Sequence, residues 1–198
     1  MRRSIGAFLD RDGTLNVEVD FLRTPDQLQV YPGAARAVRK LNDRKITTCV
    51  ISNQSGIARG YLSEANLIPI HAKLREEMLN EGATLDRIYY CPHHPTSGIE
   101  PYNIDCDCRK PKPGMLRRAE RELGIDLARS FVVGDSVVDM QAGNTVGATT
   151  ILVQTGYGEA SLRTCTLEEI PVDFVAPTVV EAIDFILDNV EGEPTDND

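Results

Sequence analysis

The sequence IGAFLDRDGT at residues 5–14 joins a short apolar run to a polar turn. The run at residues 5–9 has the length and composition of a buried β-strand, and the polar turn begins where that strand would end. Functional side chains of parallel sheets collect beyond the carboxyl ends of the strands. This stretch therefore predicts two carboxylates, Asp10 and Asp12, at the carboxyl edge of a sheet.

Apolar runs and helical patterns alternate along the rest of the chain. Further strands are predicted at residues 46–51, 88–90, 131–133, 150–153 and 174–175. Helices are predicted at residues 34–41, 63–81, 113–124, 137–144 and 179–187. This alternation indicates an α/β fold with a three-layer, mostly parallel, Rossmann-like sheet that carries helices on both faces.

Two of the predicted helices carry signals of their own. Pro69 lies inside the helix that begins at Ser63, and we expect it to kink or split that helix because proline has no backbone N–H to donate. Thr178 and Glu181 form a capping-box pattern, which predicts that the last helix begins just after Thr178.

The length of 198 residues predicts a single domain at residues 1–190. Residues 91–112 lack periodicity and are rich in Pro, Cys and His, which predicts a long irregular loop and a minimal cap. Residues 191–198 are acidic and contain a proline, so we expect them to form a disordered tail.

The composition argues against several classes of function. The chain has 21 Lys and Arg against 30 Asp and Glu, and its net charge is -9. Binding to nucleic acid depends on clustered cations, so neither nucleic acid nor an anionic membrane is an expected partner. No run is apolar enough for a membrane span or a signal peptide, and five cysteines do not suggest a disulfide scaffold. We expect a cytoplasmic monomer.

The spacing of Asp10 and Asp12 suits phosphoryl transfer. One carboxylate can attack phosphorus while the other donates and accepts protons. Together they can also hold a hard divalent cation through oxygen. The alternative is a polar turn in which Asp12 and Gly13 only reverse the chain.

Three other polar segments follow the predicted strands or precede a helix. Ser52 ends the second strand, and its hydroxyl and the N–H groups of residues 53–56 could contact phosphate, although a plain strand exit is the alternative. Lys110 lies in a turn fixed by prolines, where a solvated basic turn is the alternative. Asp135 and Asp139 follow a later strand, and Asp135 could instead cap a helix.

The order of these four motifs along the chain resembles the haloacid dehalogenase superfamily. The resemblance implies that Asp10 forms an aspartyl-phosphate and that Asp12 acts first as general acid and then as general base. It also implies that Ser52 and Lys110 steady the transferring phosphoryl group. This division of labour is reasonable, because phosphoryl transfer depends mainly on alignment and charge neutralisation.

The same resemblance implies a magnesium site. The ion would be held by the carboxylates of Asp10 and Asp135 and by the backbone carbonyl of Asp12, with Asp139 supporting the metal shell. Magnesium prefers oxygen ligands, which these residues supply.

Cysteine and histidine gather in the irregular loop. Cys91 and a nearby histidine, His93 or His94, precede Cys106 and Cys108, which gives four ligands for a tetrahedral zinc ion. Four protein ligands leave no open position, so the zinc would be structural and would fix a loop that has no core of its own. The alternatives are a disulfide or reduced free thiols.

The motifs around this loop narrow the resemblance. The segments FLDRDGTLN at 8–16, SNQSGIARG at 52–60 and YCPHHP at 90–95 are similar to the zinc-bearing branch that contains histidinol phosphatases and heptose bisphosphate phosphatases. Membership of that branch implies His93 as the zinc ligand and Arg109 as a residue that recognises the substrate. The other substrate-binding residues that we carry over are Glu18, Val19, Asp20, Phe21, Asn53, Gln54, Ser55 and Arg59.

The long spacer between His93 and Cys106 resembles the heptose enzymes of this branch. The resemblance implies a phosphatase that uses catalytic Mg²⁺ and structural Zn²⁺. Its substrate would be a sugar bisphosphate, with the 7-phosphate of D-glycero-D-manno-heptose 1,7-bisphosphate removed during nucleotide-activated heptose biosynthesis. The alternatives are a histidinol-phosphate phosphatase, a phosphotransferase or mutase acting on another sugar phosphate, and a non-catalytic zinc-binding module.

Overall fold

Six parallel strands form one sheet in the computed structural model, which describes residues 4–191, and their order is β3-β2-β1-β4-β5-β6. The strands are β1 (Gly6–Leu9), β2 (Thr47–Asn53), β3 (Arg87–Cys91), β4 (Phe131–Gly134), β5 (Thr149–Val153) and β6 (Phe174–Ala176). Every neighbouring pair is parallel. All six predicted strands are therefore confirmed, within a few residues at their ends.

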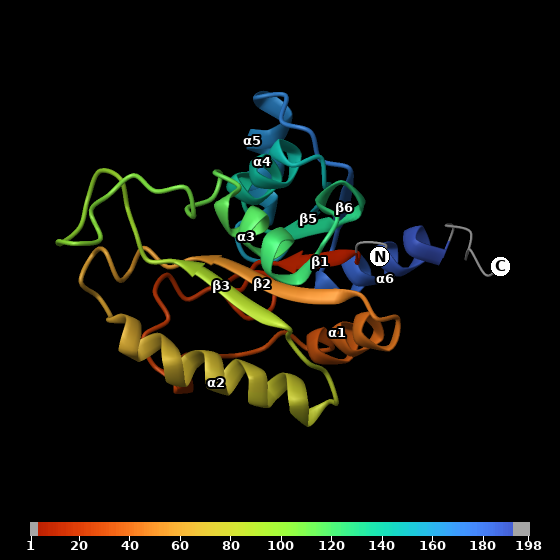
Figure 1. Cartoon of the computed structure of the whole chain (residues 1–198), viewed down its shortest axis with the longest axis horizontal. Coiled ribbons are helices and arrows are strands. Elements are labelled where there is room, and N and C mark those ends of the chain that lie inside the picture. The colour runs from red at the N-terminus through yellow and green to blue at the C-terminus, as the bar shows by residue number, and fades with distance from the viewer. Residues whose placement is uncertain (1–3, 192–198) are drawn as a thin grey trace.

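Helices cover both faces of this sheet, as Figure 1 shows. The helices on one face are α1 (Ala34–Asp43), α2 (Glu64–Asn80) and α6 (Val179–Glu191), and α1 contacts both of the others. The opposite face carries α3 (Gly114–Leu123), α4 (Val137–Thr145) and α5 (Gly158–Leu167). Two short 3-10 helices lie at Pro25–Gln27 and Leu127–Arg129. The predicted three-layer α/β architecture is confirmed.

The alternation of side chains along β1 explains why the sheet is covered on both faces. All four residues of β1 are buried, and β1 lies between β2 and β4. Ala7 and Leu9 belong to the core under α1, α2 and α6, whereas Phe8 belongs to the core on the opposite face. Successive side chains of a strand point to opposite faces, so an apolar run needs a helical layer on each side.

Two helices differ from the sequence-based expectation. Helix α2 runs unbroken from Glu64 to Asn80, so the predicted split at Pro69 is wrong. A proline at this point costs the helix one hydrogen bond, to the carbonyl four residues earlier, while the helix buries a stripe of apolar residues against the core. The residues of that stripe are Leu67, Ile70, Leu74 and Met78. Helix α5 was not predicted, because its buried residues are only Gly158, Ser161 and Cys165.

The start of the last helix and the irregular loop agree with the sequence, whereas the last helix is four residues longer than predicted. The side chain of Glu181 accepts from the backbone N–H of Thr178, and the Thr178 hydroxyl accepts from Val180, which confirms the cap of α6. Helix α6 continues to Glu191, the first residue of the expected tail; the remainder, 192–198, lies outside the described residues. Residues 92–113 contain no helix or strand. Among residues 4–191, no helix is long and apolar enough to cross a membrane.

Candidate active site and zinc-type cluster

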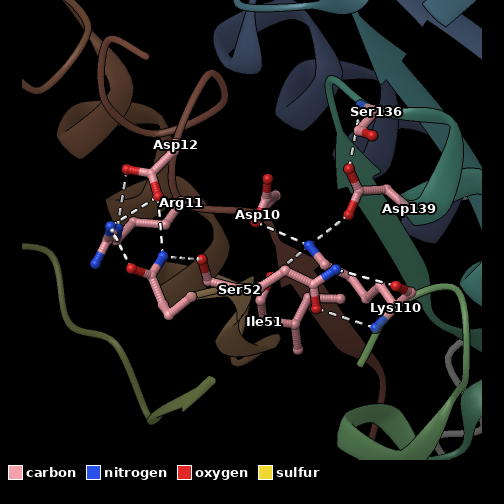
Figure 2. Close-up of polar contacts among 10 residues, drawn as sticks. Asp10, Arg11, Asp12, Ile51, Ser52, Lys110, Ser136 and Asp139 are labelled. Atoms are coloured by element: carbon pink, nitrogen blue, oxygen red, sulfur yellow. Dashed lines mark hydrogen bonds and ion pairs between the residues drawn. The ribbon is translucent and has the colours of Figure 1, made fainter. Parts of the chain in front are cut away.

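The carboxyl ends of the central strands open into a cavity of about 320 Å³. Asp10 follows β1, Ser52 lies near the end of β2, and Asp135 follows β4. Lys110 reaches the same place from the loop that follows β3, and all four residues line the cavity. Parallel strands thus bring together the four motifs that lie far apart in the sequence (Figure 2).

Lys110 is the central cation of the cavity. Its side chain is 3 % exposed, and its Nζ donates to Asp10 Oδ1 at 2.8 Å, to Asp139 Oδ1 at 2.5 Å and to the backbone carbonyl of Ile51 at 2.8 Å. Burial alone would lower the pKa of Lys110, but the carboxylates of Asp10 and Asp139 raise it above its ordinary value. The ammonium group is therefore charged at neutral pH and held by three acceptors.

Asn53 fixes the backbone that carries this lysine. Its amide Nδ2 donates to the carbonyl of Lys110 at 3.0 Å, and its Oδ1 accepts from the N–H of Lys110 at 3.0 Å. These two bonds pair the end of β2 with the loop after β3. The expected substrate-binding residue Asn53 thus has a second task, which is to position Lys110.

Three carboxylates crowd around the lysine. Oxygen atoms of Asp10, Asp135 and Asp139 lie within 4.8 Å of one another. Burial raises the pKa of Asp10 well above its ordinary range. The positive charge of Lys110 opposes this rise, and the negative charges of Asp139 and Asp135 add to it. Burial also raises the pKa of Asp135 to about 7. One ammonium cannot neutralise three carboxylates, so this oxygen-only donor set fits a hard divalent cation such as Mg²⁺.

The outer two carboxylates are also held by backbone N–H groups. Asp139 Oδ2 accepts from the N–H of Ser136 at 3.1 Å, within the capping box of α4. Asp135 Oδ2 accepts from the N–H of Tyr157 at 2.8 Å. The residue that caps α4 is therefore Ser136 and not Asp135, whose carboxylate is directed into the cluster.

Asp12 has a different environment from Asp10. Its Oδ2 accepts from Arg11 Nη2 at 2.7 Å and from Gln54 Nε2 at 3.0 Å, and its Oδ1 accepts from Asn16 Nδ2 at 3.0 Å. Burial raises the pKa of Asp12, but the Arg11 guanidinium and the other donors lower it below its ordinary value. Figure 2 shows Asp12 turned toward Arg11 and Asp10 toward Lys110.

Most of the expected substrate-binding residues border the cavity. Those that line it are Glu18, Asp20, Phe21, Asn53, Gln54, Ser55 and Arg109. Burial, together with the charge of Asp12, raises the pKa of Glu18 to about 7. Val19 and Arg59 do not line this cavity; Val19 is 38 % exposed, and Arg59 Nη2 lies 3.2 Å from His94 Nε2.

Two residues near the site were missed from the sequence. Tyr157 lines the cavity, and its hydroxyl donates to Asp20 Oδ1 at 3.3 Å. It follows β5, so its place after a parallel strand was an available signal. Arg11 is fully buried behind Asp12; its position between two aspartates gave no sign that its side chain faces the interior.

A second cluster lies at the base of the long loop. The ligand atoms of Cys91, His93, Cys106 and Cys108 all lie within 4.8 Å of one another. The distance is 3.4 Å from Cys91 Sγ to Cys106 Sγ and 3.5 Å from Cys108 Sγ to His93 Nδ1. Sulfur atoms bound tetrahedrally to zinc at about 2.3 Å would be about 3.8 Å apart, so the arrangement fits zinc with a small adjustment.

The structure brings one of the two candidate histidines to this cluster. His94 Nδ1 instead accepts from the hydroxyl and the N–H of Ser97, at 3.0 and 3.2 Å. All five cysteines lie in the described part of the chain and are free thiols. Hydrogen bonds with Cys91 lower the pKa of Cys108 to about 5, which favours the thiolate, the form that binds zinc.

The zinc-type cluster is linked to the cavity through Arg109. Its Nη1 donates to the backbone carbonyl of His93 at 3.2 Å, and its side chain lines the cavity. Glu64, at the start of α2, accepts from the hydroxyl groups of Tyr90 and Tyr102 at 2.6 and 2.8 Å. The loop is thus attached to β3 and to α2 as well as to the cysteine cluster.

A parallel sheet with carboxylates, a lysine and a hydroxyl at its carboxyl edge defines a phosphatase of the HAD type, and a family model described as HAD-hydrolase-like matches residues 107–182. The sequence is 46% identical to the D-glycero-beta-D-manno-heptose-1,7-bisphosphate 7-phosphatase of Pasteurella multocida, over 79% of this chain and 84% of that protein. It is 42% identical to the protein of the same name from Escherichia coli K12, over 79% and 83%. The chain belongs to the D-glycero-beta-D-manno-heptose-1,7-bisphosphate 7-phosphatase family.

Solved structures agree with this assignment. The D,D-heptose 1,7-bisphosphate phosphatase of B. bronchiseptica, complexed with magnesium and phosphate, has a TM-score of 0.83 and 35% identity, covering 93% of this chain and 99% of that chain. A putative HAD-like phosphatase from Mesorhizobium loti has a TM-score of 0.82 and 32% identity, covering 99% and 90%. The predicted family, fold class and enzyme class are therefore confirmed.

Proposed function

We propose that this chain removes the 7-phosphate of D-glycero-D-manno-heptose 1,7-bisphosphate, within a single domain at residues 1–190. The observation that carries the proposal is the Lys110–Asp10 pair at 2.8 Å, beside Asp135 and Asp139 in one cavity. Relatives that are 40 to 46% identical share this named activity. We assign the β anomer from the relatives' names, and we expect the enzyme to work as a cytoplasmic monomer.

Asp10 is the proposed nucleophile. Its carboxylate oxygen attacks the phosphorus, an aspartyl-phosphate forms, and the bond from phosphorus to the sugar oxygen breaks. Asp12 gives a proton to the leaving alkoxide, since a bound phosphate is a negative charge that raises the pKa of a neighbouring carboxyl group. Asp12 then takes a proton from the water that attacks the aspartyl-phosphate, the bond between phosphorus and the Asp10 oxygen breaks to free the Asp10 carboxylate, and inorganic phosphate leaves.

Charge neutralisation is the task of the residues around Asp10. Lys110 supplies one fixed positive charge, and the Ser52 hydroxyl supplies a hydrogen bond to the phosphoryl oxygens. Asp10, Asp135 and the carbonyl of Asp12 would hold Mg²⁺, with Asp139 in support. The ion, when bound, shields the negative phosphate from the attacking carboxylate.

The loop is the proposed source of specificity. Zinc held by Cys91, His93, Cys106 and Cys108 would fix the loop without taking part in the chemistry. Arg109 is placed by the carbonyl of His93, and a guanidinium suits the bidentate recognition of a second phosphate or of sugar hydroxyls. The remaining contacts are assigned to residues 18–21, 53–55 and Arg59.

A phosphate-release panel tests the proposal. Purified protein with Mg²⁺ is assayed on the β and α anomers of the heptose bisphosphate and on histidinol phosphate. The largest kcat/KM is expected for the β bisphosphate, with no activity in Asp10→Asn. A clear preference for histidinol phosphate would overturn the sugar assignment, and transfer of phosphate to a sugar hydroxyl with little free phosphate would indicate a phosphotransferase.

A further inference from the structure

Arg11 is a fully buried cation that the proposed mechanism does not use. Its side chain is 0 % exposed, although a buried guanidinium needs partners for its five N–H donors. Arg11 Nε donates to Asp12 Oδ1 at 3.1 Å, and Nη2 donates to Asp12 Oδ2 at 2.7 Å. This fork-to-fork contact fixes the plane of the carboxylate as well as its place.

Neutral groups complete the cradle around this pair. Arg11 Nη2 also donates to Gln54 Oε1 at 3.1 Å, and Gln54 Nε2 returns a bond to Asp12 Oδ2 at 3.0 Å and another to Ser52 Oγ at 2.7 Å. Asn16 donates to Asp12 Oδ1. Each carboxylate oxygen of Asp12 therefore accepts from two donors, and these neighbours set the direction of the carboxylate. Figure 2 shows Asp12 turned toward Arg11.

Helix α2 holds the far side of the guanidinium. Arg11 Nη1 lies 3.4 Å from His71 Nε2. Burial and the charge of Arg11 lower the pKa of His71 to about 4, so the ring is neutral at pH 7. Since arginine only donates, Nε2 accepts and Nδ1 carries the proton. His71 therefore holds Arg11 from the helix that also packs against the core.

We propose that Arg11 is a positioning residue for Asp12, held in turn by His71, and that it sets the direction from which Asp12 protonates the leaving group. The inference rests on the role given to Asp12 in the proposed function. Arg11 does not line the cavity, so it acts through Asp12 and not on the substrate. A misplacement of about 1 Å can cost a catalytic group about 10²-fold in rate.

Charge and position predict opposite effects when Arg11 is replaced. Without the guanidinium, Asp12 is protonated more easily, which alone would speed the proton-donating step. Without the fork, the carboxyl group loses its direction, which slows that step. If the rate falls only on substrates whose leaving group needs a proton, the fall therefore shows that the Asp12 carboxyl group has lost its position.

The experiment compares two leaving groups. The values of kcat/KM are measured for the heptose bisphosphate, whose alkoxide needs a proton, and for p-nitrophenyl phosphate, whose leaving group does not. For Arg11→Met we expect a fall of about 10–100-fold on the bisphosphate and less than about threefold on the aryl ester. Arg11→Lys keeps the charge without the fork, and it should lose nearly as much as Arg11→Met.

His71 provides a second and milder pair of variants. His71→Leu removes the acceptor and should show the same selective loss at smaller size, whereas His71→Gln keeps an acceptor and should restore the rate. Arg75→Met is the matched control, because Arg75 lies one turn further along α2 and donates to the carbonyl of Leu85. If Arg11→Met does not fold, the His71 pair decides.

Each outcome has one meaning. Equal losses on both substrates, or a gain on the bisphosphate, would overturn the positioning role of Arg11. The variant Asp12→Ala is measured on the same two substrates as Arg11→Met. If Asp12→Ala lowers kcat/KM on the bisphosphate but not on the aryl ester, and Arg11→Met shows no such selective loss, only this inference fails. If Asp12→Ala affects both substrates equally, the role of Asp12 in the proposed function fails first.

Discussion

Two buried cations give two neighbouring aspartates different environments. Lys110 donates one hydrogen bond to Asp10, which lies close to the carboxylates of Asp135 and Asp139. Arg11 donates two parallel hydrogen bonds to Asp12, whose other donors are the neutral amides of Asn16 and Gln54. The two carboxyl groups therefore differ electrostatically: the pKa of Asp10 is raised by burial and by its carboxylate neighbours, and that of Asp12 is lowered by Arg11 and the other donors.

The first prediction concerns Lys110. Lys110→Met should lower kcat by about 10²-fold or more, because a preorganised charge next to the phosphoryl group is lost. Removing one partner of a buried ion pair should also lower the free energy of unfolding of the metal-free protein by about 3–5 kcal/mol. Steady-state phosphate release and urea denaturation measure the two effects.

Lys112→Met is the control for this prediction. Lys112 is two residues away and pairs with Asp105 at 2.6 Å on the surface, where 44 % of its side chain is exposed. Its replacement should leave both kcat and the free energy of unfolding close to the parent values. Equal effects of the two substitutions would contradict a special role for Lys110.

At this scale the sequence predicted the residues that follow strands and missed those whose role depends on side-chain direction. Asp10, Ser52 and Asp135 could be found because each directly ends or follows an apolar run. Arg11 could not, because a charged residue in a turn is usually solvated and only the packing of α2 shows that it is buried. Tyr157 was hidden by the unpredicted helix α5 that it precedes.

Among the elements, the long loop depends most on bonds outside the core. It has no helix or strand between residues 92 and 113, and Ile99 and Ile104 are 55 % and 44 % exposed. Its order comes from the cysteine cluster, from the Glu64 contacts and from a bond between the N–H of Ile99 and the carbonyl of Ala58. Arg109 and Lys110 lie in the last part of this loop and line the cavity, so the order of the loop bears directly on the cavity.

The second prediction concerns replacement of two cysteines of the zinc-type cluster. In the double variant Cys106→Ser and Cys108→Ser, zinc content should fall from about one ion per chain to near zero, because structural zinc needs its thiolates. The loop should become sensitive to limited proteolysis, and KM should rise as Arg109 loses its placement. Metal analysis of protein purified without chelator, protease digestion and steady-state kinetics measure these changes.

Cys165→Ser is the matched control, because Cys165 is a buried thiol on α5 outside the cluster. It should keep the zinc content and the protease resistance of the loop. A parent protein without zinc, or a double variant that retains it, would refute the structural zinc site.

Helix and strand prediction worked where the apolar pattern was strong. The stripe Leu67, Ile70, Leu74 and Met78 keeps α2 helical through Pro69, so tertiary packing outweighed one lost hydrogen bond. Helix α5 has no such stripe, and only the finished fold shows that Gly158 packs against the backbone of Val153. Local sequence could not supply that contact.

For the whole molecule, the alternation of strands and helices predicted a parallel sheet but not the order of its strands. That order places β1 in the middle, with β2 and β3 on one side and β4 to β6 on the other. The site consequently lies where the chain turns from one half of the sheet to the other, between Asp10 after β1 and Asp135 after β4. Such a switch in direction leaves a crevice for ligands at the carboxyl edge.

The last prediction concerns the stability of the whole domain. Asp10, Asp135 and Asp139 repel one another in the folded state, and this repulsion disappears on unfolding. Magnesium binds the folded cluster, so it should stabilise the protein by about 2.7 kcal/mol at 100 times its Kd. For a chain of this length, that corresponds to a rise in Tm of about 5–11 °C.

Thermal unfolding at increasing Mg²⁺ concentration measures this effect, without a chelator that would also remove zinc. Asp135→Asn should raise the Tm of the metal-free protein slightly, because one charge leaves the cluster, and should abolish most of the response to Mg²⁺. Asp43→Asn, at an exposed residue of α1, should keep the full response. A Tm that does not depend on Mg²⁺ would show that the carboxylates do not bind the ion, because binding to the folded state must raise the unfolding temperature.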